Sequence, residues 1–505
     1  MTLADLVDAL GPLLVASPAT DRAALARPIK GIAYDSRRVA PGSVFVALRG
    51  LVADGNAFVP QAVGRGATGV VSEAEPRAEG QVPWIRVTDA RAALAAIADA
   101  FFGHPSRQMS VVGITGTNGK TTTAYLLSEI LEQAGIKCGL AGTILYRAGA
   151  DQRPAARTTP EASDMQLLLR EMVDQGCGAC VMEVSSHALA LKRADDIRFR
   201  AAVFTNLTRD HLDFHGDMDA YFASKRRLFE LLPADGAAIV NVDDLRGRAL
   251  LDVPHRIISY AIDRPADVTP GPLSFSLQGL AFQANAPCGP IAVHSRLVGR
   301  PNVYNILAAI ATAVALDIPP GAVERGLESL AGVPGRFEIV STPADAVTVV
   351  VDYAHTDDAL KNLLETARPL APQRLITVFG CGGDRDRSKR PLMGAVVARL
   401  SDVVVVTSDN PRSEEPDRII EDILRGIPPA GERGQRRTPL TIVDRRQAIE
   451  RAIAQAEPGD MVLIAGKGHE RTQVIGERVL PFDDAAVARE ALHRRRAAYG
   501  SRGPQ

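Results

Sequence analysis

The segment Val111-Val-Gly-Ile-Thr-Gly-Thr-Asn-Gly-Lys-Thr-Thr122 determines the expected fold. An apolar run typical of a strand enters a glycine-rich turn, and Lys120 and Thr121 open a predicted helix that extends to residue 134. Such a turn directs backbone N–H groups and the positive end of a helix at a phosphate. The Lys120 ammonium would reach the outer phosphates of ATP, and the Thr121 hydroxyl would bind Mg²⁺. The glycines stand at 113, 116 and 119, with Ile114 in the first glycine position of the strict G-x-x-x-x-G-K-[ST] pattern.

Strands and helices alternate along the rest of the chain. An Ala-rich helix over 91–101 and short strands precede the loop, and further strand–helix units follow it. This alternation predicts mostly parallel sheets with helices on both faces. Strands are expected at 43–48, 69–72, 84–87, 181–184, 201–205, 237–241, 347–351, 375–379, 403–407 and 461–465, and helices at 161–175, 218–232 and 303–315.

Two breaks divide this pattern. His104-Pro-Ser106 ends the first region, and Gly332-Val-Pro-Gly-Arg336 is a turn-rich joint. At roughly 100–200 residues per domain, the length is also consistent with about three domains. The section 273–297 is strand-prone but less regular, and the segment from His493 to Gln505 is expected to be a solvated tail. We therefore predict an α/β fold with a small α/β domain over 1–106, a central domain with a mostly parallel sheet over 107–335, and a Rossmann-like domain over 336–505.

Composition excludes several classes of protein. The 505 residues are 46% hydrophobic and 23% charged, which is typical of a globular protein rather than a disordered one. A formal net charge of −1 gives no general attraction for nucleic acid. The first residues carry acids where a signal peptide carries Lys or Arg, and no run reaches the roughly 20 apolar residues of a membrane span. We expect a cytoplasmic monomer that binds neither nucleic acid nor membrane.

Two spacings resemble metal sites. Cys177-Gly-Ala-Cys180 has no second Cys/His pair at zinc-finger spacing and runs into an apolar strand, so we interpret it as a turn and strand start. His211-Leu-Asp-Phe-His215 has Leu212 where a zinc protease needs its glutamate, which argues against such an enzyme.

Polar side chains follow the next two strands. Glu183 ends one predicted strand, and His211 follows another, where parallel sheets place their ligand sites. Glu183 could bind Mg²⁺ beside Thr121. Two interpretations of Asp210 stay open: that it acts in this site, and that it only orients its loop. Lys225 lies on a predicted helix and, taken alone, is interpreted as a surface lysine.

Lysine is scarce in this chain. Only eight of the 58 basic residues are lysines, so the sequence strongly favours arginine. A site that retains lysine against this bias is expected to need an amine that arginine cannot supply, and Lys120 and Lys225 are two of the eight.

At these motifs the sequence resembles the Mur ligase family, the ATP-dependent amide ligases that build the peptidoglycan stem peptide. The resemblance covers nearly the whole chain in the same order. It is carried by the phosphate loop with its shifted glycines and by the motifs Glu183-Val-Ser-Ser-His187, Asn206-Leu-Thr-Arg-Asp-His-Leu-Asp213, Gly299-Arg-Pro-Asn302, Gly335-Arg336-Phe-Glu338 and Asp352-Tyr-Ala-His355.

The resemblance implies an assignment for the ATP site. Catalysis would depend on Lys120, Glu183, His211 and Lys225. Two Mg²⁺ ions would be bound by Thr121, Glu183, His211 and Lys225, the last as a carbamate formed with CO₂. ATP would contact Gly116, Thr117, Asn118, Gly119, Lys120, Thr121, Thr122, Asn302, Arg336 and Asp352.

Within the family the chain is most similar to members that add the third amino acid to UDP-N-acetylmuramoyl-L-alanyl-D-glutamate. Asp409-Asn-Pro-Arg412 resembles the motif of those that take meso-diaminopimelate, whose distal carboxylate a guanidinium can bind in bidentate fashion. The reaction implied proceeds through an acyl phosphate to an amide, ADP and phosphate. The substrate contacts implied are Ser36, Thr158, Thr159, Ser185, Arg193, Arg385, Asp409, Asn410, Pro411, Arg412, Gly466 and Glu470.

Departures from the family pattern occur at Arg157, Leu191, Leu51-Val52 and Asp357. Three alternatives also stay open. One is a ligase with another acceptor, either an L-lysine-adding relative or a folylpolyglutamate synthase-like enzyme. Another is a P-loop motor or switch, although no convincing Walker-B aspartate is found. The third is a nucleic-acid module over 385–390, against which the interleaved acids and the low net charge argue.

Overall fold

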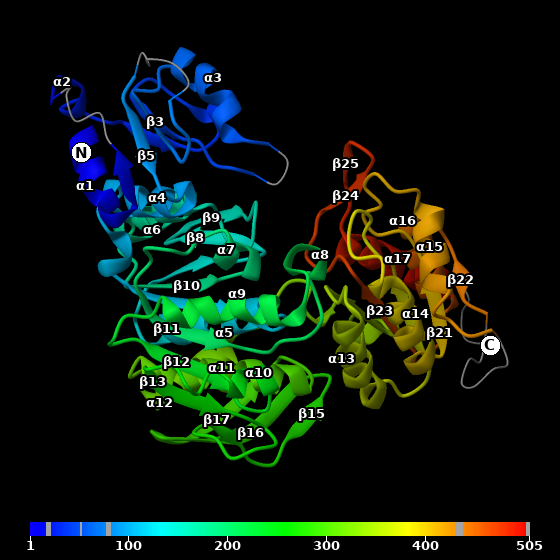
Figure 1. Cartoon of the computed structure of the whole chain (residues 1–505). Coiled ribbons are helices and arrows are strands. Elements are labelled where there is room, and N and C mark those ends of the chain that lie inside the picture. Colours follow the sequence, from blue (N-terminus) through cyan, green and yellow to red (C-terminus); the bar gives the residue numbers. More distant parts are fainter. Residues whose placement is uncertain (17–21, 51–52, 77–81, 430–437, 501–505) are drawn as a thin grey trace.

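A computed structural model describes residues 1–16, 22–50, 53–76, 82–429 and 438–500 (Figure 1). Three α/β units follow one another along the chain, as the alternation of strands and helices predicts. In Figure 1 the first unit (blue) packs on one end of the central unit (cyan to green), and the last unit (yellow to red) lies beside the central one, near α8 (Leu212–His215).

The first unit is a five-stranded sheet in the order β1-β5-β4-β3-β2, parallel except at β1. Helix α4 (Ala90–Phe101) and helix α1 (Leu3–Leu10) bury their leucines and alanines against it. Ala162 of the central unit belongs to the same core, so the two units share an apolar contact. The strands are β1 (Leu14–Ala16), β2 (Gly31–Ala33), β3 (Ser43–Val46), β4 (Gly69–Ser72) and β5 (Trp84–Val87).

The central sheet has eight strands in the order β13-β12-β11-β6-β10-β7-β8-β9. Its first six strands are parallel, and β7, β8 and β9 form an antiparallel extension that the sequence pattern does not reveal. The strands are β6 (Ser110–Thr115), β7 (Cys138–Ala141), β8 (Leu145–Ala148), β9 (Asp151–Pro154), β10 (Ala179–Glu183), β11 (Phe199–Phe204), β12 (Ala237–Asn241) and β13 (Arg256–Tyr260).

Helices cover both faces of this sheet. One face packs on α5 (Lys120–Gln133), α11 (Arg300–Ala315) and α12 (Pro320–Ser329), and the other on α6 (Ala162–Asp174) and α9 (Met218–Glu230). The section 273–297 forms a separate antiparallel sheet against α11 and α12. Its strands are β14 (Thr269–Pro270), β15 (Ser274–Ser276), β16 (Gly279–Ala286) and β17 (Gly289–Ser295).

The third unit contains a six-stranded sheet in the order β18-β19-β23-β20-β21-β22, parallel except at β18. The strands are β18 (Glu338–Ile339), β19 (Thr348–Asp352), β20 (Leu375–Phe379), β21 (Val403–Val406), β22 (Leu440–Thr441) and β23 (Met461–Ala465). The helices are α13 (Asp357–Ala367), α14 (Lys389–Leu400), α15 (Pro416–Leu424), α16 (Arg445–Gln455) and α17 (Asp484–Gly500), and a hairpin joins β24 (Thr472–Ile475) to β25 (Arg478–Pro481).

The expectation of a solvated tail from His493 is wrong for residues 493–500, while residues 501–505 lie outside the described residues. These residues continue α17, which packs on α16. Arg494 pairs with Glu450 at 2.7 Å, and the buried Arg495 donates to the carbonyl of Ile453. Two arginines of the basic run therefore contact α16, and the third, Arg496, pairs with Asp345 at 2.9 Å.

A buried ion pair connects the end of β23 to α16 and α17. Arg445 and Asp484 have fully buried side chains and form two hydrogen bonds of 2.6 and 2.8 Å. Arg445 also donates to the carbonyl oxygens of Ala465 and Ser408, which terminate or follow β23 and β21. This pair holds the carboxyl ends of two strands that lead into the candidate site.

Asp484→Asn should destabilise this third unit, because it leaves the Arg445 charge buried without its partner. Breaking such a pair costs about 3–5 kcal/mol. Native-state hydrogen exchange of the β23 amides would measure this loss as faster exchange. Arg446→Gln removes a half-exposed pair with Glu490 on the same two helices and should leave exchange nearly unchanged. Equal effects of the two substitutions would contradict this account.

Candidate active site

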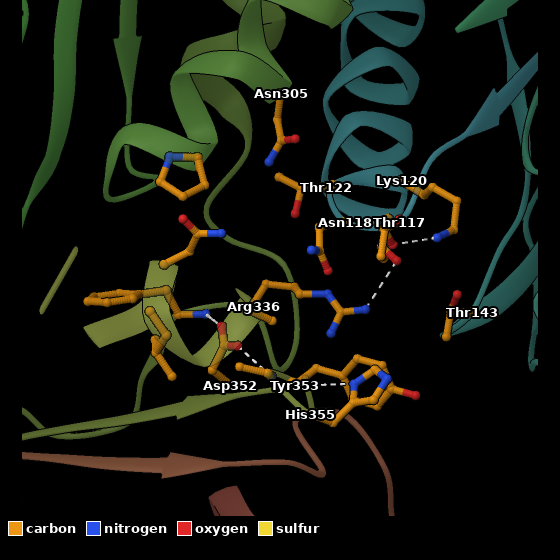
Figure 2. A pocket seen from close by; sticks show the side chains of 18 of the residues that line it. Thr117, Asn118, Lys120, Thr122, Thr143, Asn305, Arg336, Asp352, Tyr353 and His355 are labelled. Carbon is orange, nitrogen blue, oxygen red and sulfur yellow. Dashed lines mark hydrogen bonds between the residues drawn. The ribbon is translucent and has the colours of Figure 1, made fainter. Parts of the chain in front are cut away.

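A cavity of about 300 Å³ lies between the central and third units. The phosphate loop after β6, Glu183 at the end of β10, His211 after β11 and the segment from Asp352 after β19 all line it. Figure 2 shows the phosphate-loop side chains on one side, Tyr353 and His355 on the other, and Arg336 extending between them. The structure thus brings together the carboxyl ends of strands from two sheets.

The phosphate loop has the geometry that its glycines predict. Gly116 and Gly119 have φ of +144° and +92°, in the region that favours glycine, and a Cβ at Gly116 would lie 1.8 Å from Thr205 Oγ1. Asn206 holds the loop, because its backbone carbonyl and its side-chain oxygen accept from the N–H groups of Thr117 and Asn118 at 2.9 Å each. The predicted helix begins at Lys120, directly after the turn.

Lys120 folds back on its own loop. Its ammonium donates to the carbonyl oxygens of Gly116 and Thr117, both at 2.9 Å. Burial lowers the pKa of Lys120, and the Arg336 charge lowers it further, whereas Glu183 and Asp210 oppose this. A phosphate at the loop would supply the anion that this buried amine lacks.

Glu183 and Thr121 form an oxygen-rich site beside the loop. The Thr121 hydroxyl donates to Glu183 Oε2 at 3.0 Å, and the Thr143 hydroxyl and N–H donate to the same carboxylate at 2.9 and 2.8 Å. In the described part of the chain, no three His, Cys, Asp or Glu side chains group as a metal site. The carboxylate and the two hydroxyls beside it are oxygen donors, and this donor set fits Mg²⁺, which typically takes one or two carboxylates and completes its shell with phosphate oxygens and water.

The interpretation of Lys225 as a surface lysine is wrong. Its side chain is 1% exposed on α9, and its amine donates to the carbonyl of Gly116 at 2.7 Å. Burial lowers the pKa of Lys225 well below its ordinary value, and the Lys120 charge lowers it further. The tertiary fold, through α9, brings this lysine to the back of the phosphate loop, where burial favours its neutral amine.

His211 and Asp210 both line the cavity, and Asp210 also accepts from the His211 N–H at 2.9 Å, so it orients its own loop as well. Burial lowers the pKa of His211, so the imidazole is neutral and able to bind a cation. Although burial opposes ionisation of Asp210, His355, Lys389 and the His211 N–H outweigh it and lower the Asp210 pKa. His355 belongs to the third unit, and its Nε2 lies 3.9 Å from Asp210 Oδ2, so this carboxylate connects the two units.

The residues predicted to contact the nucleoside also converge on the cavity. Arg336 donates to Thr121 Oγ1 at 3.2 Å and stacks over the Tyr353 ring at 4.4 Å. Asp352 accepts from two backbone N–H groups at 2.7 Å each, and burial raises its pKa. Asn302, at the start of α11, donates to the carbonyl of Val298.

A second polar group adjoins Glu183. Thr159 donates to the Glu183 carbonyl at 2.9 Å and accepts from the Ser185 N–H, while Thr158 lines the cavity. Arg193 pairs with Glu161 at 2.7 Å, and Arg157, which departs from the family pattern, pairs with the same carboxylate at 3.0 Å.

The predicted contact Ser36 is separate from this group, since it lies in the first unit and donates to Gln61. Leu51-Val52 lie outside the described residues.

A third group lies at the carboxyl ends of β20, β21 and β23. Asn410 and Lys467 both donate to Glu470 Oε2 at 2.9 Å, and among the described residues no donor binds its Oε1. Gly466 has φ +118°, and a Cβ there would lie 2.5 Å from Asp409 Oδ2. Arg385 and Arg412 complete the group, with the buried Pro411 between Asn410 and Arg412.

Several residues of the site escape the sequence analysis. Thr143 comes from the unpredicted β7–β8 turn, Tyr353 lies in a motif whose other residues are the predicted contacts, and Asp358 lies beyond that motif on α13. Asp358 accepts from the Asn118 side chain at 3.2 Å, which links α13 to the phosphate loop. For Tyr353, the sequence signal is its place in the motif Asp352-Tyr-Ala-His355, directly after β19.

The two metal-like spacings have structural explanations. Cys180 lies in β10 and Cys177 just before it, both buried in the core, as the interpretation of a turn and strand start predicts. His211 and His215 each stack against His187, at ring distances of 4.8 and 5.4 Å.

The loop, the oxygen site and the cavity between two α/β units define an ATP-using α/β enzyme. Three family models match the chain: "Mur ligase family, catalytic domain" over 28–102, "Mur ligase middle domain" over 114–313 and "Mur ligase, glutamate ligase domain" over 335–468. The chain belongs to the Mur ligase family and is an ATP-dependent amide ligase.

Relatives match over nearly the full length. A protein from Geobacter sulfurreducens named UDP-N-acetylmuramoyl-L-alanyl-D-glutamate--2,6-diaminopimelate ligase is 48% identical, covering 97% of this chain and 98% of the relative. The protein of that name from Geobacter metallireducens is 47% identical over 94% and 97%. A solved structure with the same name is 32% identical, with a TM-score of 0.67, and covers 98% of this chain and 99% of its own. No helix in the described part of the chain has the length and apolarity of a membrane span.

Lys120→Ala should abolish ATP binding, because it removes the cation at the phosphate loop. We expect the Kd for a non-hydrolysable ATP analogue, measured by calorimetry, to rise at least 100-fold. Lys137→Ala is the matched control, since Lys137 donates to the Gln175 carbonyl at an exposed turn. A similar Kd in both variants would remove Lys120 from the nucleotide site.

Proposed function

We propose that the protein joins the γ-carboxylate of D-glutamate in UDP-N-acetylmuramoyl-L-alanyl-D-glutamate to an amine of meso-diaminopimelate. The observation that carries this proposal is the group of Arg385, Arg412 and Glu470 at the carboxyl end of the third sheet. The names of relatives that are 47–48% identical over the whole chain support the same substrates.

The charges of this group suit the distal end of diaminopimelate, which carries both a carboxylate and an ammonium. Burial lowers the pKa of Arg412, and the Arg385 charge lowers it further, so a carboxylate placed between the two guanidinium groups would relieve their repulsion. Glu470 Oε1 would accept from the distal ammonium. Lysine lacks the distal carboxylate and would leave the two arginines unneutralised.

Two steps account for the reaction. The γ-phosphoryl group of ATP passes to the D-glutamate carboxylate, giving an acyl phosphate and ADP, and the amine then displaces phosphate and forms the amide. Lys120 and the phosphate-loop N–H groups would hold the phosphates, and Thr158, Thr159, Ser185 and Arg193 would hold the dipeptide. Catalysis would be mainly positioning and neutralisation of charge.

Mg²⁺ would neutralise the anions that must meet in the first step. Thr121 and Glu183 would hold one ion, and His211 with a carbamate on Lys225 would hold the second. The neutral form of an amine combines with CO₂, and burial of Lys225 favours that form, whereas arginine has no equivalent chemistry. Its proximity to the Gly116 carbonyl would place the new carboxylate behind the loop.

Each unit would then bind one substrate. The first unit, with Ser36, would bind the uridine nucleotide, the second would bind ATP, and the third would bind the incoming amino acid. All of these are soluble metabolites, which favours a cytoplasmic enzyme. The two alternative ligases differ from this proposal at different points. An L-lysine-adding relative would have a different pocket for the incoming amino acid, and a folylpolyglutamate synthase-like enzyme would attach the amino acid to a different substrate.

An acceptor panel tests the substrate assignment. With UDP-N-acetylmuramoyl-L-alanyl-D-glutamate, ATP and Mg²⁺, phosphate release should be at least 100-fold faster with meso-diaminopimelate than with L-lysine, because only the former has a carboxylate for the two arginines. Phosphate release is measured with a coupled assay. Equal or faster release with L-lysine, or with L-glutamate, would contradict the proposal.

Lys225→Ala should lower kcat at least 100-fold, and a short-chain carboxylic acid should restore part of the activity by replacing the carbamate. In ¹³C-bicarbonate the unsubstituted protein should show a carbamate carbon resonance that Lys225→Ala lacks. Lys361→Ala is the control, since Lys361 pairs with Glu365 at 3.9 Å on the surface of α13. Unchanged turnover or an unchanged resonance in Lys225→Ala would exclude the carbamate.

A further inference from the structure

The two arginines of the proposed amino-acid pocket lie on separate loops. Arg385 belongs to the loop after β20, and Arg412 to the loop after β21. Both side chains flank Gly382, where a Cβ would lie 3.0 Å from Arg412 Nη1 and 3.8 Å from Arg385 Cγ. Since the two like charges repel each other, other contacts must keep the two loops together.

The backbone on both loops is strained. Asp384 and Arg412 have φ of +53° and +52°, a left-handed conformation that is costly for residues other than glycine. Asp384 precedes Arg385 directly, so each strained residue sets the direction of one guanidinium. Such conformations persist only where surrounding contacts determine them.

Glu414 supplies the main contact between the two loops. Its Oε1 accepts from the backbone N–H of Asp384 at 2.7 Å and from Arg390 Nη2 at 2.8 Å, and its Oε2 accepts from Arg390 Nη1 at 3.0 Å. Arg390 is 1% exposed and also donates to the carbonyl of Gly382 at 3.3 Å. Glu414 therefore binds the backbone after Gly383 directly and the backbone before it through Arg390.

Further hydrogen bonds connect the same loops. Ser413 donates to the Asp384 carboxylate from its hydroxyl at 2.7 Å and from its N–H at 3.2 Å. The Gly383 N–H donates to the carbonyl of Asn410 at 2.9 Å, and Arg412 Nη1 donates to the Gly383 carbonyl at 2.6 Å. Among these contacts, only the one between Glu414 and Arg390 is a charge pair with a fully buried partner, so its loss would cost the most.

We propose that Glu414 is a positioning residue that sets the spacing of Arg385 and Arg412 and thereby the selectivity for an amino acid with a second carboxylate. The inference rests on the proposed function, because it assigns those arginines to the distal carboxylate. Glu414 acts through the two loops and through Arg390, and its own carboxylate is occupied by these donors.

Simple electrostatics makes the opposite prediction. The hydrogen bonds from Arg390 lower the pKa of Glu414 to about 2, so the carboxylate is ionised at neutral pH. Removing this negative charge would strengthen the attraction of the two arginines for a carboxylate. A positioning role instead predicts weaker binding, because the arginines would lose their common orientation. The sign of the change therefore separates the two explanations.

The test compares Glu414→Gln with the unsubstituted enzyme in steady-state kinetics, with meso-diaminopimelate and L-lysine as acceptors. We expect the KM for diaminopimelate to rise at least tenfold and the ratio of kcat/KM values, diaminopimelate over lysine, to fall at least tenfold. The KM for ATP should change less than twofold. Arg412→Ala shows the effect of losing one of the two guanidinium groups. Glu450→Gln is the matched control, because it neutralises a carboxylate that pairs with Arg494 between α16 and α17.

A lower KM for diaminopimelate, an unchanged acceptor ratio or a parallel rise in the KM for ATP would overturn the inference. If Glu414→Gln does not fold, Glu414→Asp takes its place, because it retains the charge and shortens the side chain by one methylene. It should lower the ratio of kcat/KM values, diaminopimelate over lysine, at least threefold. A ratio equal to that of the unsubstituted enzyme would overturn the inference. Failure of the proposed function is distinguishable, because the unsubstituted enzyme would then not prefer diaminopimelate.

Discussion

The carboxyl ends of β6, β10 and β11 face the carboxyl end of β19 across one cavity, and the proposed chemistry depends on this arrangement. Parallel strands place their loops at one edge of a sheet, so each sheet collects its polar residues there. Contacts between the units, such as Arg336 to Thr121 and Asp358 to Asn118, hold the two edges close. An acyl phosphate made at one edge would thus meet an amine bound at the other.

Charged side chains of both signs line this cavity: the cations Lys120 and Arg336, and the acids Glu183, Asp210 and Asp352. Lys225 is buried and Lys120 half-buried near Gly116, and burial lowers the pKa of each. Bringing ATP and a carboxylate together requires neutralisation of several negative charges, which under the proposed function the two cations and a Mg²⁺ ion held by Glu183 would supply. In the third unit, the two arginines and Glu470 would do the same for the charges of the incoming amino acid.

Local sequence pattern predicts the parts of the fold that local physics controls. The strands 69–72, 84–87, 237–241, 375–379 and 461–465 have the predicted bounds, because buried parallel strands are continuous apolar runs. The extension by β7, β8 and β9 is not predictable in this way, since β9 is exposed and polar. Lys225 shows the same limit for the site: its spacing indicates a helix surface, and only the packing of α9 against the phosphate loop buries it. The contacts of Arg494 and Arg495 are not predictable locally either, because their partners on α16 lie about 40 residues away in sequence.

The central claim is that the D-glutamate carboxylate is activated by phosphorylation before the amine attacks. A UDP-N-acetylmuramoyl-dipeptide with ¹⁸O in the γ-carboxylate of its D-glutamate tests it directly. With ATP and meso-diaminopimelate, mass spectrometry should find one ¹⁸O atom transferred to each phosphate released, because the carboxylate oxygen that bridges to phosphorus leaves with it. Phosphate without ¹⁸O, with amide formed at the same rate, would contradict the account.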